Sequence, residues 1–392
     1  MNQASMFMSP ERVVFGTGCV QQIGELALEL GQKAFVVTDN NVHKLDIFKT
    51  IEKSLKKSKL EYYVYSEVDA NPTDVQVEKG ADVYRHEKAD ILIGVGGGSA
   101  MDSAKAIGIL IGNGGAIRDY DFDSAVDFSN VKTLTQPIPP LITIPTTAGT
   151  GAEVTAWAVV TNTKDKYKFF PGGWQAIPKI ALVDPLMMES MPPLVTATTG
   201  MDALCHAIEA IASPYAMSQT DAFAFSAINH IVTHIGPAVA NGSNIEARKG
   251  MALGAMEAGL SMNAWCGGVH ALGHQLSTQA DMPHGMAMGL MMPSVMAFNL
   301  MACPDRYADI AHTMGEKIDD LNVMDAAAKA PKAVKKLLAL VGLPTSLKEC
   351  GIDKKIFEEC AKWAIRDSDV QGNPRTISYE QALTLFYEAY DH

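Results

Sequence analysis

Asp202 and His206 stand four residues apart in the segment GMDALCHAIEA, a spacing that places both side chains on one face of a helix. A later segment, GGVHALGHQLSTQADMPHG, supplies His270, His274 and His284. One carboxylate with several imidazoles suits a divalent first-row metal, either iron or zinc, and four protein ligands or fewer leave a position for a substrate oxygen. The surrounding Gly and Ala residues favour this interpretation, because they let chains crowd a small ion.

The same spacing also occurs where no metal site is expected. His230 and His234 are four residues apart in SAINHIVTHIGPAV, with no partner carboxylate and no second cluster. We interpret them as histidines of a core edge or of the surface. The methionines that follow His284 are interpreted as packing material of a helical core.

Three consecutive glycines, Gly96, Gly97 and Gly98, follow an apolar run and precede a helical pattern in ILIGVGGGSAMDSAKAIG. Backbone N–H groups exposed by such glycines, at the start of a helix, can bind the pyrophosphate of a dinucleotide. The alternative is a tight turn between strand and helix with no ligand. The segment does not match the G-x-G-x-x-G fingerprint, so the glycines alone leave both readings open.

Polar residues at the ends of two other strands make the nucleotide interpretation more specific. Asp39 ends an early strand, where a carboxylate can accept hydrogen bonds from an adenosine ribose and repel a 2′-phosphate, which favours NAD over NADP. A solvated turn Asp is the alternative. Thr146, Thr147 and Thr150 likewise follow a strand and carry hydroxyls able to bond a cofactor.

The elements that must position these residues alternate in the first half of the chain. Apolar runs that predict strands are followed by helical patterns, and continuous apolar strands suit a parallel sheet covered on both faces. The predicted strands are KAFVVT, EYYVYSEV, DILIGVGGG, PLITIPTT and KIALVDP, and WAVVTNTKDKYKFF predicts a hairpin. We therefore expect a doubly wound α/β domain over residues 1–190.

The second half of the chain has a different residue pattern. From Pro193 onward the pattern is helical and rich in Ala, Met and Leu, interrupted by proline at Pro214, Pro237, Pro283, Pro304 and Pro344. Residues 191–392 are therefore expected to form an all-α domain that holds the metal. The overall fold class is α/β, with an N-terminal mostly parallel sheet and a C-terminal helical domain.

Composition excludes several classes of function. The net charge of −12 and the lack of a basic cluster argue against a nucleic-acid partner. No signal-peptide pattern opens the chain and no apolar run is long enough to span a bilayer, so we expect a cytoplasmic protein with no membrane partner. Six scattered cysteines read as free thiols.

Several segments, taken together, resemble a known family. GGGSAMDSAKAIG, IPTTAGTGAEVT, LVDP, ATTGMDALCHAIEA, GVHALGHQLSTQADMPHGMAMGLMMP and the late GNPR are similar, in this order, to the iron-containing (group III) alcohol dehydrogenases. The similarity covers nearly the whole chain. The lactaldehyde reductase, methanol dehydrogenase and propanediol dehydrogenase branches look nearest.

The resemblance assigns roles to individual residues. It implies that the metal ligands are Asp202, His206, His270 and His284, with iron(II) as the expected ion and zinc as the alternative. His274 then corresponds to a histidine near the nicotinamide and substrate, which is expected to relay a proton. The cofactor contacts that it implies for NAD are Asp39, Asn71, Gly97, Gly98, Ser99, Thr146, Thr147, Thr150 and Lys168. The family also implies a homodimer or larger homo-oligomer.

The predicted function is hydride transfer between NAD and a short primary alcohol or diol, with the corresponding aldehyde as the other substrate. A bulky Trp157 after the TTAGT segment is expected to shrink the site, and Cys266 and Asp369 are expected to border it. Two alternatives remain: a dehydroquinate synthase-like lyase that uses NAD and a metal, and a non-catalytic scaffold. The lyase would require basic residues for a phosphorylated substrate, and these motifs lack them.

Overall fold

The computed structural model describes residues 5–121, 131–165 and 167–391. Contacts between residues divide the chain into two units. We call them the α/β unit and the helical unit. The α/β unit comprises Met8–Thr147 and Gly151–Ser190, and the helical unit comprises Met191–His392 with the segments Met1–Phe7 and Ala148–Thr150.

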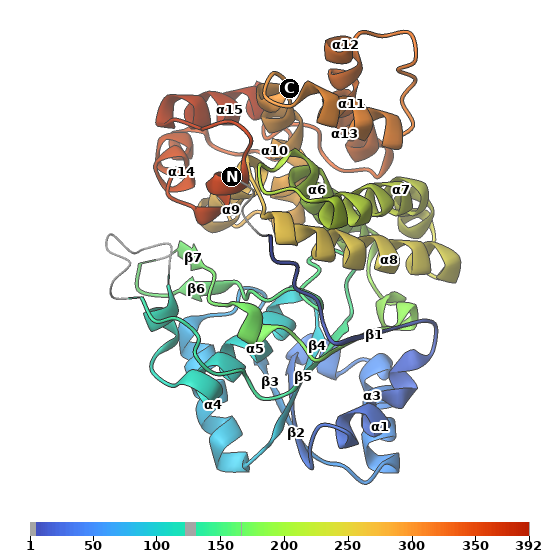
Figure 1. Cartoon of the computed structure of the whole chain (residues 1–392), viewed down its shortest axis with the longest axis vertical. Coiled ribbons are helices and arrows are strands. Elements are labelled where there is room, and N and C mark those ends of the chain that lie inside the picture. Colours follow the sequence, from blue (N-terminus) through green and yellow to red (C-terminus); the bar gives the residue numbers. More distant parts are fainter. Residues whose placement is uncertain (1–4, 122–130, 166, 392) are drawn as a thin grey trace. The chain divides into compact units, whose positions relative to one another are not determined.

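A six-stranded sheet with the order β1-β8-β5-β4-β2-β3 forms the centre of the α/β unit (Figure 1). Every neighbouring pair of strands is parallel. The strands are β1 (Arg12–Phe15), β2 (Lys33–Asp39), β3 (Glu61–Val68), β4 (Ile91–Gly96), β5 (Leu141–Pro145) and β8 (Ile180–Val183). The predicted α/β class and parallel sheet are confirmed.

Alternation along each strand explains why both faces of this sheet are covered. Successive side chains of β2 point to opposite faces, so Phe35 and Val37 belong to one buried cluster and Ala34 and Val36 to the other. The first cluster contains residues of α4 (Asp74–Glu87) and α5 (Gly98–Asn113), and the second contains residues of α1 (Ile23–Leu28) and α3 (Asp46–Lys57). The sheet is therefore doubly wound.

Two smaller features complete the α/β unit. The predicted hairpin is present as the antiparallel pair β6 (Val160–Asn162) and β7 (Tyr167–Phe169). The edge strand β1 was missed, because its four residues, RVVF, are too few to show a period and two of them are exposed. Its pairing with β8, which is far away in sequence, forms it.

The helical unit begins with α6 (Pro193–Ala212), which is buried over most of its length and contacts α7, α8 and α10. Its other helices, all seen in the upper part of Figure 1, are α7 (Ser218–Ala240), α8 (Ile245–Ser261), α9 (Gly268–Gln279), α10 (His284–Asn299), α11 (Pro304–Thr313), α12 (Val323–Ala327), α13 (Lys329–Leu340), α14 (Phe357–Ala364) and α15 (Tyr379–Asp391). After Pro193 the described residues form no strand. The predicted change from alternating strands and helices to helices alone is confirmed.

One predicted helix break is wrong. Pro237 lies inside α7, which continues to Ala240. A proline removes one backbone hydrogen bond, but Ile231, Ile235 and Ala238 are fully buried and hold the last turns in place. Packing therefore outweighs the local preference.

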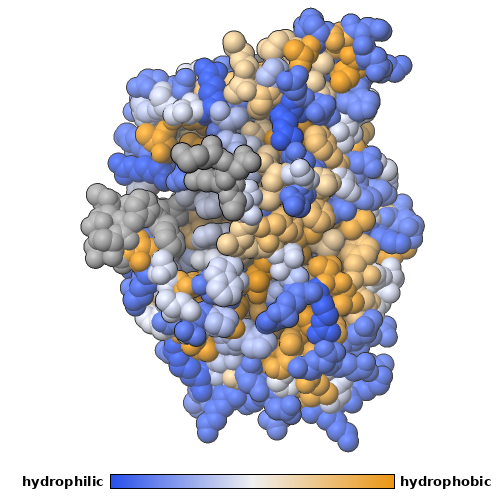
Figure 2. Space-filling view, viewed as in Figure 1, coloured by the Kyte–Doolittle hydropathy of each residue, from blue (hydrophilic) through white to orange (hydrophobic). Residues whose placement is uncertain are grey.

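Among the described residues, no helix is long and apolar enough to cross a bilayer. Apolar residues on the face drawn in Figure 2 lie among hydrophilic ones, and hydrophilic residues predominate at its lower end. All six cysteines are free.

Candidate metal centre and nucleotide-binding residues

Helix α6 carries two members of the predicted metal cluster. Asp202 and His206 are buried one turn apart, with Nε2 of His206 3.9 Å from Oδ1 of Asp202. The apolar residues around them allow α6 to be buried on nearly all sides, while Pro193 occupies its first turn, where a missing N–H is tolerated. The polar pair is thus held inside a rigid, apolar element.

Two further helices bring the remaining histidines to α6. His270 lies in the first turn of α9, and His284 is the first residue of α10, preceded by Pro283. Gly285 permits the close approach of α10, because a Cβ there would lie 2.0 Å from the backbone oxygen of Thr198 on α6. The Pro-His-Gly sequence therefore fixes both the start of α10 and its distance from α6.

Oδ1 of Asp202 is the point on which three imidazoles converge. Nε2 of His284 lies 3.3 Å from it, Nε2 of His270 3.8 Å and Nε2 of His206 3.9 Å. The rings of His206 and His270 are stacked, with centroids 4.6 Å apart. His284 is the most open member, with 31 % of its side chain exposed, against 6 % or less for the other three.

The polar atoms of this cluster fit a divalent cation. Oδ1 of Asp202, Nδ1 of His206 and Nε2 of His270 are buried and make no hydrogen bond. Burial would raise the pKa of Asp202, but the neighbouring histidines lower it well below its ordinary value. Burial lowers the pKa of His206 to about 4, so that its ring is neutral and can act as a ligand. Buried polar atoms without a partner lower the stability of the fold unless an ion binds to them.

Glu209 is a residue of this site that the sequence interpretation missed. Its Oε2 lies 2.5 Å from Nδ1 of His270, and its Oε1 accepts hydrogen bonds from the backbone N–H groups of Val269 (2.6 Å) and His270 (3.3 Å). Burial opposes its ionisation, but His270 and the backbone N–H groups outweigh burial and lower its pKa. Its position one turn after His206 was the available signal.

His274 occupies a separate group beside the cluster. Its Nδ1 lies 2.9 Å from Oδ2 of Asp367 and 3.8 Å from Oδ2 of Asp369, and its ring stacks on that of His284 with centroids 5.3 Å apart. Asp367 caps the short helix η8 (Ser368–Gly372) by accepting from the N–H of Asp369. The sequence had suggested Asp369 as a border residue, whereas Asp367 was missed.

His230 and His234, which share the four-residue spacing but were not expected to bind a metal, lie elsewhere in the helical unit. Nδ1 of His234 is 2.8 Å from the backbone oxygen of His230, and His230 is 3.9 Å from Glu257. Among the residues that the structure describes, neither belongs to a group with metal-binding geometry.

The predicted pyrophosphate loop connects β4 to the 16-residue helix α5. Gly96 has a φ of +149°, a conformation that favours glycine, and Gly97 is the N-cap of α5 without a side-chain cap. Gly98 is the first residue of the helix. The N–H groups of Ala100 and Met101 donate to the oxygen of Gly97 (3.2 and 3.4 Å), and the start of such a helix is suited to an anion.

The threonines after β5 lie beside this loop. The N–H of Thr146 donates to the oxygen of Gly96 (2.8 Å), and a Cβ on Gly97 would lie 3.5 Å from the side chain of Thr147. Oγ1 of Thr147 is buried without a hydrogen-bond partner, so it is available to a polar group of a ligand. Thr150 is grouped with the helical unit.

Other predicted nucleotide contacts also have local roles. Oδ1 of Asp39 caps α2 (Asn40–His43) by accepting from the N–H groups of Asn41 (2.8 Å) and Val42 (3.0 Å). Ser99 donates to the oxygen of Ala70 (2.6 Å), next to the exposed Asn71. Asp39 can cap α2 and also bind a ribose, because both capping hydrogen bonds use Oδ1 and neither uses Oδ2.

Lys168 lies on β7, near a buried network that supports the loop after β5. Its charge acts on Asp102, a buried residue of α5 that accepts a hydrogen bond from the N–H of Val159 (3.1 Å). The fully buried Lys105 donates to the oxygen of Trp157 (2.8 Å) and to Thr155 (3.0 Å). Asp102 and Lys105 therefore act as structural supports.

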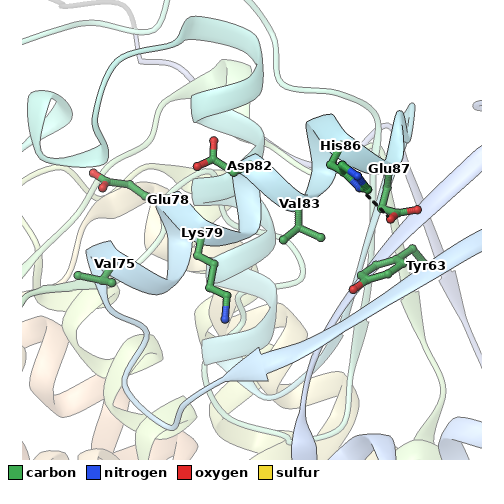
Figure 3. Close-up of a pocket in the computed structure, with 8 residues that line it drawn as sticks. All are labelled: Tyr63, Val75, Glu78, Lys79, Asp82, Val83, His86 and Glu87. Atoms are coloured by element: carbon green, nitrogen blue, oxygen red, sulfur yellow. Dashed lines mark hydrogen bonds and ion pairs between the residues drawn. The ribbon is translucent and has the colours of Figure 1, made fainter.

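A surface depression on α4 contains none of these residues. Figure 3 shows its wall, formed by α4 side chains and by Tyr63 of β3, with His86 turned toward Glu87. It is wide open and lined by charged side chains of both signs. The chemistry described above lies elsewhere.

Comparison with protein families gives two matches that together span nearly the whole chain. Residues 10–185 match the model described as iron-containing alcohol dehydrogenase. Residues 196–390 match the model described as Fe-containing alcohol dehydrogenase family, C-terminal. The resemblance inferred from the motifs is thereby confirmed.

Curated relatives agree with these models. The chain is 39% identical over 389 residues to 1,3-propanediol dehydrogenase of Citrobacter freundii, covering 98% of each chain. It is 36% identical to NAD-dependent methanol dehydrogenase of Bacillus methanolicus (98% of this chain, 99% of the relative). It is 34% identical to lactaldehyde reductase of Escherichia coli K12 (99% and 100%).

Solved structures share the fold. Alcohol dehydrogenase from Oenococcus oeni superimposes with a TM-score of 0.94 at 39% identity, covering 99% of this chain and 100% of that one. Sulfoacetaldehyde reductase from Bifidobacterium kashiwanohense, in complex with NAD+, has a TM-score of 0.85 at 28% identity, covering 99% of each. All these relatives are named as dehydrogenases or reductases, which favours the redox interpretation over the lyase and scaffold alternatives.

Proposed function

The chain belongs to the iron-containing alcohol dehydrogenase family, and from this premise we propose that it interconverts a short primary alcohol or diol and the corresponding aldehyde with NAD. The reaction moves a hydride from the alcohol carbon to NAD⁺ and releases the hydroxyl proton. The observation that carries the proposal is the convergence of three imidazoles on the buried Oδ1 of Asp202.

We propose that Asp202, His206, His270 and His284 hold the metal, as iron(II) in the first place and zinc as the alternative. A divalent ion held there supplies Lewis acidity toward the alcohol or aldehyde oxygen. Asp202 contributes a negative charge in a site from which water is largely excluded. Glu209 accepts a hydrogen bond from Nδ1–H of His270, which keeps the proton on Nδ1 and leaves the Nε2 lone pair available.

His274 is the residue we propose to carry the proton of the reaction. It is buried beside His284, and Asp367 at 2.9 Å fixes the orientation of its ring. A positioned general acid or base contributes about 10²–10⁴-fold, so loss of His274 is expected to reduce the rate less than loss of the metal ligands.

We propose that residues 1–190 form the NAD-binding domain and residues 191–392 the metal-binding domain. The NAD contacts are proposed to come from Asp39, Asn71, Gly97, Gly98, Ser99, Thr146, Thr147, Thr150 and Lys168. The positive φ of Gly96, the uncapped start of α5 and the unpartnered Oγ1 of Thr147 support a pyrophosphate at the loop after β4. The carboxylate of Asp39 supports NAD over NADP.

A short alcohol or diol is proposed as substrate for two reasons. The relatives named above include enzymes for propanediol, methanol and lactaldehyde. Trp157 places a bulky indole against the backbone of Gly172, where a Cβ would lie 2.8 Å from its ring. A large rigid side chain in this segment is expected to restrict the length of the substrate.

We further propose a cytoplasmic homodimer or larger homo-oligomer. Strand β1 is an edge of the sheet, and Val13 on it is 40% exposed. An edge strand offers unpaired backbone groups to another strand, which supports self-association through the α/β unit.

The test is NADH absorbance under anaerobic conditions with ferrous iron, NAD⁺ and a panel of short alcohols and diols. We expect NADH formation that a chelator abolishes and that added iron restores. Absence of activity in both directions, with folded and metal-loaded protein, would refute the proposal. The same assay with NADP⁺ measures the preference between cofactors.

A further inference from the structure

Residues 372–375, with the sequence GNPR, begin at the last residue of the short helix η8. The glycine of this motif packs against the turn before α9. A Cβ on Gly372 would lie 1.7 Å from the carbonyl oxygen of Cys266, so only glycine fits this position. The motif therefore lies directly against the turn that leads into α9, the helix of His270.

Asn373 makes all four hydrogen bonds that an asparagine side chain can make. Its Oδ1 accepts from the N–H of Gly268 (3.2 Å) and from Nδ2 of Asn299 (2.7 Å). Its Nδ2 donates to Oδ1 of Asn299 (2.9 Å) and to the backbone oxygen of Arg375 (2.5 Å). Asn299 and Asn373 are only 3% and 8% exposed, so these bonds form largely away from water. No other side chain of this size offers two donors together with an oxygen that accepts twice.

These bonds join the ends of two helices that carry candidate ligands. Gly268 is the first residue of α9, two residues before His270. Asn299 is the last residue of α10, the helix that begins with His284. Asn373 therefore holds the start of one ligand-bearing helix against the end of the other.

Arg375 adds a second contact to the end of α10. Its guanidinium donates to the backbone oxygen of Phe298 (2.9 Å) and lies over the ring of the same residue, 3.9 Å from the centroid. A positive charge at the end of a helix also suits the helix dipole. Both polar residues of the motif thus bind the end of α10, and Asn373 also connects it to α9.

The first three N–H groups of α9 all donate to side chains from outside the helix. The N–H of Gly268 donates to Asn373, and those of Val269 and His270 donate to Oε1 of Glu209. The first N–H groups of a helix have no backbone partner within it, and the N-cap residue of α9 is a glycine that supplies no side-chain cap. The two outside side chains therefore replace the missing cap.

We propose that Asn373 is a positioning residue of the metal centre, which fixes the start of α9, and with it His270, relative to α10. This inference rests on the proposed metal centre. All the donors and acceptor sites of Asn373 are already used, so it acts through the backbone of α9 and not as a ligand. Ligands that are held in place before an ion binds lose less conformational entropy on binding, so loss of Asn373 is expected to weaken metal binding.

Asn244 provides a matched control. It is the N-cap of α8, and its Oδ1 accepts from the N–H of Ala247 (3.1 Å). Helix α8 carries none of the four candidate ligands. Loss of either asparagine removes a side-chain cap from a helix, so both changes are expected to lower the melting temperature. Only the loss of Asn373 is expected to change metal binding.

The experiment uses the full-length protein and two readouts, zinc affinity and cobalt(II) absorbance. Competition between the metal-free protein and a chelator measures the zinc affinity. The visible d–d bands report the coordination geometry of cobalt, which a loss of stability alone does not change. Asn373→Ala is expected to bind zinc about tenfold more weakly and to shift the d–d bands, whereas Asn244→Ala should match the native protein in both readouts.

Asn373→Asp is the second variant. It keeps an acceptor for the N–H of Gly268 but loses both donors, so a smaller effect in the same direction is expected. If Asn373→Ala does not fold, as judged by circular dichroism, Asn373→Asp decides on the same two readouts.

Native zinc affinity with native d–d bands in the folded Asn373 variant would limit Asn373 to a structural role and overturn the proposal. Equal changes in Asn244→Ala would also overturn it, because the loss of any helix cap would then be sufficient. A native protein that binds no zinc and gives no d–d bands with cobalt would instead contradict the metal centre of the proposed function, and the role of Asn373 with it.

Discussion

Nδ1 of His274 lies 2.9 Å from Oδ2 of Asp367, while Asp369 lies 3.8 Å from the same nitrogen. A carboxylate at hydrogen-bond distance fixes which ring nitrogen carries the proton and where the other nitrogen points. Asp367 is therefore expected to position His274 without contacting substrate itself.

Asp367→Asn is predicted to lower kcat about tenfold with little change in KM, because the ring of His274 loses its fixed orientation but the substrate contacts remain. Steady-state kinetics with solvent isotope effects would measure this. Asp369→Asn is the matched control, and a smaller effect is expected from it. Equal losses in both variants, or a loss confined to KM, would contradict a positioning role for Asp367.

Glu209 is predicted to set the affinity of the metal centre through His270. Glu209→Gln keeps the size of the side chain. It removes the negative charge of the group that accepts the hydrogen bond from Nδ1 of His270. Loss of such an outer partner typically costs about 10–100-fold in metal affinity. Titration of the metal-free protein with zinc would show it. An unchanged affinity in a folded Glu209→Gln variant would limit Glu209 to a role in holding the start of α9.

Much of the fold could be predicted from local pattern. The strands of the parallel sheet are short apolar runs bounded by turn residues, and α6 and α9 carry their histidines at helical spacing, so the main elements follow from the sequence itself. Strand β1 could not be found in this way, because RVVF acquires its conformation from pairing with β8, 168 residues later. Pro237 shows the same limit, since tertiary packing keeps α7 helical through it.

The four candidate ligands were predictable from helical spacing and from the resemblance, whereas the residues that hold the histidines in place were not. Asp202 and His206 are one turn apart, but Asp367 reaches His274 from a segment more than 90 residues away. Glu209 follows His206 by one helical turn, a spacing visible in the sequence, but a search limited to metal ligands does not consider it. Residues that hold a ligand in place have no fixed spacing from it, so three-dimensional contact is needed to identify them.

Asp39 allows the choice between NAD and NADP to be separated from helix capping. Asn is as good a cap as Asp, so Asp39→Asn should keep α2 while removing the charge that repels a 2′-phosphate. A charge contact in a solvated site is worth about 1 kcal/mol or more, which predicts an increase of about fivefold or more in kcat/KM with NADP⁺.

Asp39→Ala is the control for this substitution. It removes both the cap and the charge, and is expected to cost about 1 kcal/mol of stability in addition. If NADP⁺ turnover rises in neither variant, Asp39 acts only as the cap of α2.

Trp157→Ala is predicted to extend the range of alcohols toward longer chains. Each methylene group accommodated in an apolar pocket is worth about 1–3 kcal/mol, so kcat/KM for butanol or hexanol, relative to propanol, should rise about tenfold or more. Trp174, which is 58% exposed, serves as the control tryptophan. A chain-length profile that is the same in the native protein and in Trp157→Ala would show that the indole does not limit the substrate.

Glu153 is predicted to make the α/β unit less stable as the pH rises from about 4.5 to about 7. Burial raises the pKa of this carboxyl from its ordinary 4.5 to about 7, and Lys105 only partly offsets that. Below pH 4.5 the group is protonated in both the folded and the unfolded chain and has no differential effect. Between the two values the folded chain holds a proton that the unfolded chain has lost, so stability falls with rising pH.

Glu153→Gln removes this titration, so the variant should gain stability relative to the native protein across the same window. The pKa difference converts to at most about 3.5 kcal/mol, at about 1.4 kcal/mol per pH unit. Melting temperatures of both proteins, measured at several pH values between 4 and 8, would show the difference widening up to pH 7 and then levelling. A difference that stays constant with pH would mean that the pKa of Glu153 is the same in the folded and the unfolded chain, with its burial fully compensated.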